Sequence, residues 1–312
     1  MTEPFHDEPA FLTELPEELR ERRALAIRRR RWRRRLALLA LLAVAGGVAA
    51  IIVTGVGGGS SSRRGAGEAA SKPTTQAEVP SGSYPADWQP HTGPVPILEY
   101  HAIQPPVAGS PSPELFVPQA DFQRQMQWLA DHGFEAVTVI QVEDAWYEDG
   151  ELPPKPIVVS FDDGFLSQYV AAFPMLQKLD WPGVLNLKAE GSDLPDEDAQ
   201  KMIDAGWELA SHTITDVDLT AVDDATLERE VAASKRILEH RFGVAVENLA
   251  YPSGRYDERV ISAVHRAGYR GAMAEIPGLA SAVHPYILNR IEIEFSDGLD
   301  GFIQKLESAG AG

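Results

Sequence analysis

Three short polar clusters in this sequence carry side chains that could do chemistry. The first is Ser160–Gly164 (SFDDG), which follows the apolar run Pro156–Val159. Its two adjacent carboxylates, Asp162 and Asp163, could divide the work of a hydrolase. One would act as a general base, while the other would bind a metal ion that lowers the pKa of a neighbouring water. A strand-to-helix turn, in which Asp caps the helix and Gly adopts a positive φ, is the alternative explanation.

The second cluster is Ser211–Leu219 (SHTITDVDL), which closes the run Glu208–Ala210. His212 and Asp216 are four residues apart, so one helical turn would bring both toward a common ion. A buried histidine with a purely structural hydrogen bond is the competing interpretation. The third cluster, Tyr251–Arg255 (YPSGR), ends another apolar run and by itself indicates only a turn.

The elements that must position these clusters alternate along the body of the chain, from Val95 onward. Short runs of β-branched residues, bounded by Pro, Gly or Asp, predict strands. These are Val95–Tyr100, Glu135–Val139, Ile157–Phe161, Gly183–Leu187, Glu208–Ser211, Asn248–Tyr251, Gly271–Ala274 and Ile287–Ile293. The amphipathic stretches between them predict helices. These are Gln119–His132, Leu166–Leu179, Asp196–Ala205, Asp223–Phe242 and Asp257–Ala267, while Asp144–Leu152 is predicted to be a polar loop. Such alternation predicts a parallel sheet, open or closed into a barrel, with active-site residues at the carboxyl ends of its strands.

Together, the three clusters resemble the polysaccharide deacetylases, carbohydrate esterase family 4, whose members share the nodulation-type chitooligosaccharide deacetylase domain. The resemblance covers about residues 94–307 and rests on the order and spacing of the Asp-Asp-Gly, Ser-His-Thr and Tyr-Pro-x-Gly motifs. Pro94–Ile103 looks like the first strand of this family, and Arg290 and Ile291 match a strand of its cell-surface branch. The resemblance implies an α/β fold, a distorted (β/α)7 barrel.

The resemblance also implies an activity, the hydrolysis of N-acetyl groups on a polymer of N-acetylhexosamine. Asp162 would be the general base, and Asp163 and His212 would ligate a divalent metal, usually Zn²⁺, that polarises the acetyl carbonyl. A backbone N–H near Tyr251 would stabilise the oxyanion. Thr213 and Pro252 would shape the substrate groove.

The sequence departs from the family pattern at the third metal ligand. The family has a second His four residues after the first, whereas this chain has Asp216. Carboxylates do bind Zn²⁺, and an Asp-His-Asp set should tolerate Mn²⁺, Co²⁺ or Mg²⁺ better than Asp-His-His does. The substitution could equally mark a site that has lost its metal.

The general acid is a second departure. Many members supply a His from a late Leu-x-His motif, and no such motif follows residue 275. His284 is the only histidine in that region, and a surface histidine in a loop is the alternative explanation for it. His101 is a further candidate near the barrel mouth, with a hydrogen-bonding role in the core as its alternative.

Composition and charge narrow the possible partners. The chain has 312 residues, no cysteine and a formal net charge of −18. The lack of cysteine excludes disulfide frameworks, thiolate zinc sites and cysteine nucleophiles. Nucleic acid is not expected as a partner, because phosphate binding needs clustered Lys and Arg. The charge is uneven, since residues 1–35 contain ten arginines whereas residues 86–312 contain 37 acidic and 15 basic residues.

The arginines of the N-terminal region directly precede the uncharged run Leu36–Val56. At ~1.5 Å per residue this run would span ~31 Å, about the hydrocarbon thickness of a bilayer. We therefore expect a transmembrane anchor at 36–56, with residues 1–35 as a cytoplasmic tail because positive residues stay inside. A cleaved signal peptide is the alternative, although its leader would be unusually long. The Gly/Ser/Pro-rich residues 57–90 predict a flexible linker, and 91–312 the deacetylase-like domain.

The leading hypothesis is a single-pass membrane protein with an extracellular, metal-dependent deacetylase domain that acts on cell-wall or surface glycan. A catalytically impaired glycan-binding domain on the same scaffold is an alternative, motivated by Asp216 and the missing late His. An O-acetyl esterase acting on xylan-type polymers is another. A structural membrane protein is the fourth hypothesis, but a structural turn does not need both Asp162 and Asp163.

Overall fold

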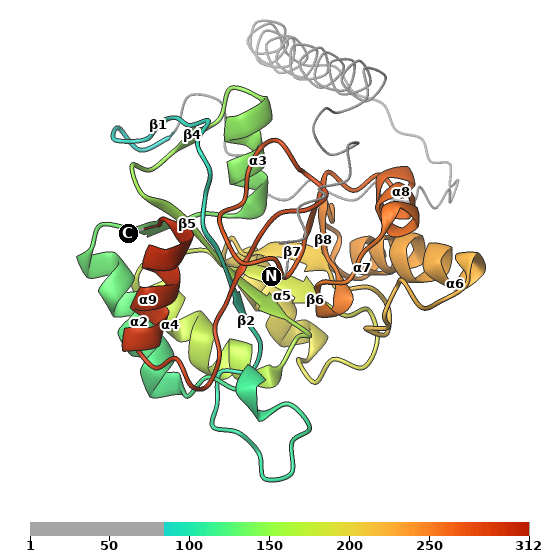
Figure 1. The fold of residues 1–312 in the computed structure, drawn as a ribbon, viewed down its shortest axis with the longest axis horizontal. Coiled ribbons are helices and arrows are strands. Elements are labelled where there is room, and N and C mark those ends of the chain that lie inside the picture. Colours follow the sequence, from blue (N-terminus) through green and yellow to red (C-terminus); the bar gives the residue numbers. More distant parts are fainter. Residues whose placement is uncertain (1–83, 312) are drawn as a thin grey trace, which may run out of the picture. The chain divides into compact units, whose positions relative to one another are not determined.

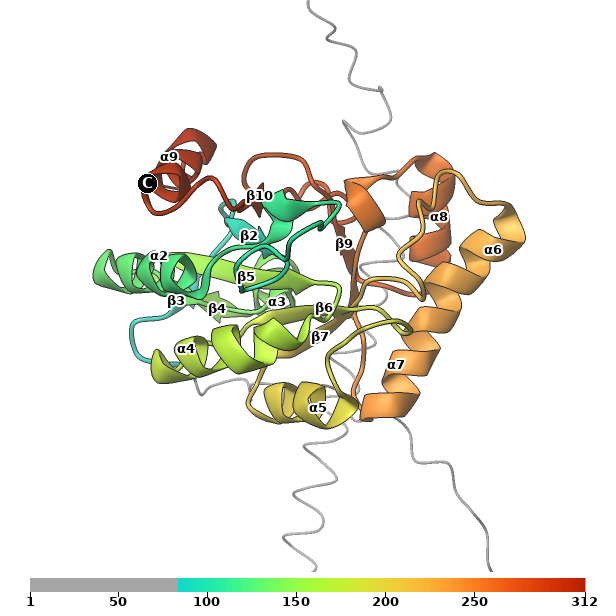
Figure 2. The same ribbon diagram turned by 90° about the horizontal axis from the view of Figure 1, so that it is seen from below.

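The computed structural model of the chain describes residues 84–311. In this part of the chain a curled parallel β-sheet forms the centre, and helices cover its outer face (Figures 1 and 2). The predicted α/β class is therefore confirmed, as a curled parallel sheet covered by helices. The predicted cytoplasmic tail (1–35), the anchor (36–56) and most of the linker (57–90) lie outside the described residues.

The central sheet has the strand order β10-β2-β5-β6-β7-β8-β9, and β3 pairs with β5 beside this path. Its strands are β2 (Ile97–Tyr100), β3 (Glu135–Ala136), β5 (Pro156–Asp162), β6 (Val184–Leu187), β7 (Glu208–Ser211), β8 (Asn248–Ala250), β9 (Gly271–Met273) and β10 (Ile291–Glu292). These strands pair in parallel. Just before β10, Leu288 forms a parallel bridge with Met273 of β9. The segment around β10 therefore contacts both β2, beside it in the strand order, and β9, at the opposite end of that order.

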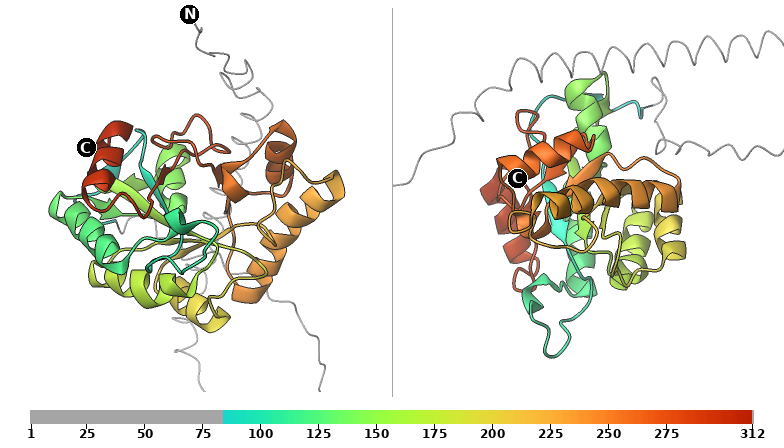
Figure 3. Two further views of the ribbon diagram at one scale, coloured as in Figure 1. Left: turned by 60° about the horizontal axis from the view of Figure 1, so that its bottom comes forward. Right: turned by 90° about the vertical axis from the view of Figure 1, so that its right-hand side faces the viewer.

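Most helices follow one another around the outside of the curled sheet (Figure 3), whereas the helix Val139–Tyr147 packs against the apolar cluster of its inner face. The helices are α2 (Gln119–Asp131), α3 (Val139–Tyr147), α4 (Phe173–Lys178), α5 (Asp196–Asp204), α6 (Asp224–Glu228), α7 (Ser234–Phe242), α8 (Glu258–Arg266) and α9 (Asp300–Ala309). Local chemistry sets several of their ends. The Asp223 and Asp257 side chains cap α6 and α8 by accepting backbone N–H groups, and Gly243 ends α7 at a φ of 71°.

The predicted strands and helices have counterparts, with boundaries that differ by a few residues. The predicted polar loop Asp144–Leu152 is wrong, because it contains the end of α3 and the short strand β4 (Glu151–Leu152). Strand β4 pairs with β1 (Gln89–Pro90), which lies within the predicted linker. Helix α3 was not expected from the sequence, because its Val-rich start resembles a continuation of β3.

The inner face of the sheet changes from apolar to polar along the strands. Successive side chains of a strand point to opposite faces, so residues two apart share a face. The buried apolar cluster contains Ile97, Val158, Val184 and Ala210, one from each of four neighbouring strands, together with residues of α3. Two positions further along lie the polar residues Glu99, Ser160, Asn186 and His212, which are also buried. The inner face of the sheet therefore carries buried apolar side chains first and buried polar side chains at the carboxyl ends of the strands.

The outer face of the sheet packs through aromatic rings, both on helix α2 and on Trp207, which directly precedes β7. Phe161 of β5 stacks on Trp207 with ring centroids 5.2 Å apart, and Tyr100 of β2 meets Phe122 of α2 edge to face at 5.2 Å. Both strand aromatics are fully buried. Burying each such side chain contributes about 2 kcal/mol, so this layer fixes the strands that carry the polar residues.

The predicted location in the membrane requires correction. Among the residues that the structure describes, none of the helices combines the length and the hydropathy that crossing a bilayer requires. The run Leu36–Val56, on which the expectation of a single-pass protein with an extracellular domain rested, lies outside those residues.

Candidate functional site

The loop after β5 presents two carboxylates in succession. Asp162 is the last residue of β5, and Asp163 and Gly164 follow it with φ angles of 73° and 75°. A Cβ atom on Gly164 would lie 2.3 Å from the Leu187 side chain and 2.5 Å from Ser192 Oγ, so only glycine fits. This turn lets the chain reverse while both aspartates stay at the strand end.

Asp162 is fully buried and ion-paired. Its Oδ1 atom accepts hydrogen bonds from Arg290 Nη1 at 2.8 Å and from Asn186 Nδ2 at 2.6 Å, whereas Oδ2 has no hydrogen-bond partner. Burial alone would raise the pKa of Asp162, but the charge of Arg290, with smaller contributions from His212 and His101, holds it well below its usual range. The side chain is therefore an anion whose Oδ2 is free to accept a proton.

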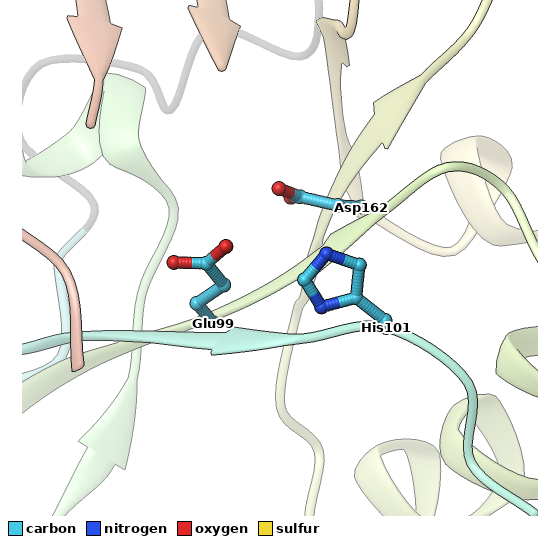
Figure 4. Close-up of side chains that lie close together, drawn as sticks. All are labelled: Glu99, His101 and Asp162. Carbon is cyan, nitrogen blue, oxygen red and sulfur yellow. The ribbon is translucent and has the colours of Figure 1, made fainter. Parts of the chain in front are cut away.

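Glu99 lies in strand β2 and His101 directly follows that strand, and both side chains lie near Asp162 (Figure 4). Their ligand atoms and that of Asp162 lie within 4.8 Å of one another. Glu99 Oε1 is 3.0 Å from Arg290 Nη2, so the buried arginine forms ion pairs with two buried carboxylates, those of Glu99 and Asp162. Burial lowers the pKa of His101, although the charges of Asp162 and Asp163 oppose this effect.

The loop after β7 carries His212 and Asp216 in a turn rather than in a helix. Thr213 and Asp216 adopt left-handed φ angles of 64° and 61°, and Thr213 Oγ1 accepts the Asp216 N–H at 3.1 Å. His212 donates through Nδ1 to the Ala250 carbonyl at 3.0 Å. Its Nε2 therefore faces the carboxylates, 3.2 Å from Asp216 Oδ1 and 4.0 Å from Asp163 Oδ1.

The ligand atoms of Asp163, His212 and Asp216 lie within 4.8 Å of one another, and this set fits a divalent metal ion. The Nδ1 hydrogen bond to a backbone carbonyl directs Nε2 toward the two carboxylates, which is the usual arrangement of a metal-ligating histidine. The Lys188 Nζ atom lies 3.2 Å from Asp163 Oδ1 as an ion pair, without the alignment of a hydrogen bond. Two carboxylates and one imidazole are ligands that Zn²⁺, Mn²⁺ and Co²⁺ accept.

The buried Glu99, His101 and Asp162 set is the poorer metal site, although its geometry is equally tight. Arg290 already neutralises part of its negative charge, and a cation placed there would face a guanidinium in a buried environment. Around His212, by contrast, negative charge prevails. Burial opposes a positive charge on His212, but Asp162, Asp216 and Asp163 raise its pKa to about 9. The same carboxylates attract a metal cation.

The residues predicted to shape the substrate groove are buried in this structure. Thr213 and Tyr251 are fully buried, and Pro252 is buried in a short 3₁₀ turn, Pro252–Gly254. The Tyr251 hydroxyl donates to the Tyr286 carbonyl, and the Tyr251 N–H donates to the Met273 carbonyl at 3.0 Å. These side chains are therefore packed inside the fold rather than along an open groove. The Tyr251 N–H already donates to a backbone carbonyl, so it is not free to bind an oxyanion.

His284 lies away from the other predicted residues. Its neighbour Pro285 accepts the Ala272 N–H beside the first residue of β9, and Ala282 accepts from the Tyr147 hydroxyl of α3. These contacts belong to the amino ends of the strands, whereas Asp162 and His212 lie at the carboxyl ends. This placement gives no support to the expectation that His284 serves as the general acid.

Three residues of the site have no role in the sequence-based prediction. They are Arg290 and Asn186, which bind Asp162, and Glu99, which shares Arg290. Charged residues inside otherwise apolar strands, such as Arg290 within Ile287–Ile293, were the available signal. Asn186 could be found only from the register, which places it opposite Asp162.

Comparison with known proteins matches this chain to polysaccharide deacetylases, both by family model and by individual relatives. The family model for polysaccharide deacetylase matches residues 149–272. YxkH of Bacillus subtilis (strain 168), whose name places it among the polysaccharide deacetylases, is 30% identical over 212 residues, which cover 66% of this chain and 73% of YxkH. The poly-β-1,6-N-acetyl-D-glucosamine N-deacetylase of Escherichia coli (strain K12) is 32% identical over 120 residues, 38% of this chain and 17% of that enzyme.

Solved structures agree with the sequence matches. The Streptococcus pyogenes deacetylase PplD, solved in complex with acetate, superposes with a TM-score of 0.62 at 26% identity. That superposition covers 69% of this chain and 99% of PplD.

Proposed function

The chain belongs to the polysaccharide deacetylases, carbohydrate esterase family 4, and on this premise we propose that it removes N-acetyl groups from a polymer of β-linked N-acetylglucosamine with the help of a divalent metal ion. Enzymes of this family hydrolyse N-acetyl amide bonds. The observation that carries the proposal is the convergence of Asp163, His212 and Asp216 within 4.8 Å, beside the unpartnered Oδ2 of Asp162. The substrate class is supported by the similarity to the Escherichia coli enzyme.

The residues of the site would have distinct roles in the reaction. Asp163, His212 and Asp216 would hold the metal ion, which when bound lowers the pKa of a water and polarises a carbonyl. Asp162 takes the proton of the attacking water at Oδ2, and Arg290 and Asn186 fix its carboxylate through Oδ1. The C–N bond then breaks, and the products are acetate and a glucosamine amine.

The leaving amine needs a proton, and His101 is the histidine whose side chain lies beside Asp162. Burial lowers the pKa of His101, which makes its protonated form a stronger acid. We therefore assign the proton transfer to His101 rather than to His284.

The fold that positions these residues is, in our proposal, the distorted seven-stranded barrel of the family. The bridge between Met273 and Leu288, together with the pairing of β10 and β2, supports closure of the sheet. Residues 91–312 would form this domain.

Calorimetric titration of the full chain with Zn²⁺, Co²⁺ and Mn²⁺ tests the metal assignment without any guess about the substrate. We expect stoichiometric binding that Asp163→Ala abolishes. Absence of binding by the unaltered chain would instead favour a glycan-binding domain on the deacetylase scaffold.

A further inference from the structure

The turn that carries His212 and Asp216 is held from outside the site by one buried carboxylate, that of Glu230. Glu230 Oε2 accepts the backbone N–H groups of Ile214 at 2.9 Å and of Thr215 at 3.0 Å. Its Oε1 atom accepts the Thr215 hydroxyl at 3.1 Å. All three hydrogen bonds therefore end on the two residues that separate Thr213 from Asp216.

This turn cannot rely on regular secondary structure for its shape. It contains left-handed φ angles at Thr213 and Asp216, neither of which is a glycine. Such conformations cost of order 1–3 kcal/mol each and persist only where the surrounding structure enforces them. Within the turn, the Thr213 Oγ1 contact to the Asp216 N–H supplies one restraint. The Glu230 carboxylate supplies three more from a different element.

The placement of Glu230 depends on an irregularity of its helix. Residues Arg229–Ala233 form a π-helical segment between α6 and α7, and Glu230, Val231 and Ala232 are buried in succession. Such segments are rare, and they occur frequently at functional sites. Glu230 is fully buried here, with Arg229 Nη2 3.5 Å from its Oε1 atom as the nearest cation. A buried carboxylate is costly unless it is hydrogen-bonded. Apart from the long contact from Arg229 at 3.5 Å, the hydrogen bonds of Glu230 come from the turn.

We infer that Glu230 is a positioning residue that fixes the His212–Asp216 turn in the shape required for metal binding. Its hydrogen bonds go to Ile214 and Thr215 rather than to the side chains of the proposed ligands, so it acts through the residues between them. The inference rests on the proposed metal site. Residues that orient metal ligands typically contribute 10–100-fold to metal affinity, and we expect a loss in that range when Glu230 is truncated.

The test compares the full chain with Glu230→Ala, Glu230→Gln and a matched control, Glu239→Ala. Glu239 belongs to the same helical stretch, and its carboxylate also accepts a backbone N–H, from Val246 at 3.2 Å, but it does not contact the turn. Calorimetry measures Zn²⁺ and Co²⁺ affinity, and the visible spectrum of bound Co²⁺ reports the ligand geometry. Glu230→Ala should weaken binding roughly 10–100-fold and change the Co²⁺ spectrum, whereas Glu239→Ala should do neither. Glu230→Gln retains a carbonyl oxygen for the two N–H groups, so its metal affinity should lie between the affinities of Glu230→Ala and the unaltered chain.

Hydrogen exchange of the peptide that spans residues 212–216 separates this inference from the metal assignment. Loss of Glu230 should accelerate exchange at Ile214 and Thr215 while strand β7 remains protected. If the unaltered chain binds no metal, the proposed function fails, and the exchange result still decides whether Glu230 holds the turn. Unchanged exchange, unchanged metal affinity, or equal losses in Glu230→Ala and Glu239→Ala would overturn the inference.

Discussion

Arg290 Nη1 lies 2.8 Å from Asp162 Oδ1, and Nη2 of the same guanidinium lies 3.0 Å from Glu99 Oε1. All three side chains are buried. Strand β5 supplies one carboxylate and strand β2 the other, while the arginine precedes β10 on the far side of β2. One side chain thus connects three strands and keeps the proposed general base ionised.

Removing Arg290 should destabilise the fold strongly. Arg290→Met would leave Asp162 and Glu99 as unpaired buried carboxylates, and we expect a loss of about 3–5 kcal/mol in the free energy of unfolding. Urea denaturation measures this change. The control is Arg255→Met, because Arg255 is 65% exposed and its pair with Asp218 should contribute at most about 1 kcal/mol. Similar losses in the two variants would refute a special role for Arg290.

Neutralising Asp162 should stop the reaction without removing the metal. Asp162→Asn keeps the size of the side chain but cannot take a proton at Oδ2, so acetate release should fall by a factor of about 10²–10⁴. Metal affinity should stay close to that of the unaltered chain, because Asp162 is not among the proposed ligands. Asp204→Asn, on the exposed face of α5, is the matched control. An active Asp162→Asn enzyme would remove Asp162 from the role of base.

Replacing Asp216 by the histidine common in the family should favour zinc. Asp216→His supplies a second imidazole, and we expect roughly tenfold tighter Zn²⁺ binding, or about 1.4 kcal/mol, with a smaller gain for Mn²⁺. Competition calorimetry with a chelator measures the difference. Asp218→His, two residues further on, should leave the affinity unchanged because Asp218 pairs with Arg255 instead. Equal zinc affinities for the unaltered chain and the Asp216→His variant would mean that residue 216 is not a ligand.

A buried carboxyl at the amino ends of the strands should make stability depend on pH. Burial raises the pKa of Glu143 to about 8, although Arg270, whose Nε is 3.1 Å from Glu143 Oε2, opposes this. In the unfolded chain the group ionises near its ordinary pKa of 4.5, so the native state binds an extra proton between about pH 4.5 and 8. Stability from this group is complete below that window and falls as pH rises through it, by at most about 1.4 kcal/mol per pH unit.

The variant Glu143→Gln should lack this part of the pH dependence. Between pH 5 and 9 its midpoint of thermal unfolding should fall less than the midpoint of the unaltered chain does. Glu307→Gln, on the exposed side of α9, should retain the full dependence. Glu208, whose pKa burial raises to about 7, contributes in the same direction and remains in both variants. Identical pH profiles for Glu143→Gln and the unaltered chain would contradict the assignment.

Local patterns account for what could be predicted from the sequence. The β-branched run before Asp162 and the alternation of Glu208, Ala210 and His212 fix both the strand and the face on which the polar residue lies. The spacing of His212 and Asp216 correctly predicts that they come together, although through a left-handed turn rather than a helix.

Contacts between distant segments could not be predicted in the same way. Arg290 reaches Asp162 over 128 positions of the chain, and Asn186 does so only through the register of β5 and β6. Helix α3 was missed because its Val-rich start resembles a continuation of β3, although Val139, Val142 and Ala145 share one helical face that fills the apolar cluster inside the sheet. The position of His284 could not be predicted for the same reason, since it depends on how the chain returns to the amino ends of the strands.

Acetate release from a β-1,6-linked N-acetylglucosamine oligomer, measured on the full chain with and without a chelator, tests the central claim most directly. The account predicts release with Zn²⁺, Co²⁺ or Mn²⁺, loss of release on chelation, recovery on adding metal back, and no release by Asp163→Ala. Undiminished release by the chelated chain or by Asp163→Ala would contradict the assignment of Asp163, His212 and Asp216 as the metal centre of the reaction.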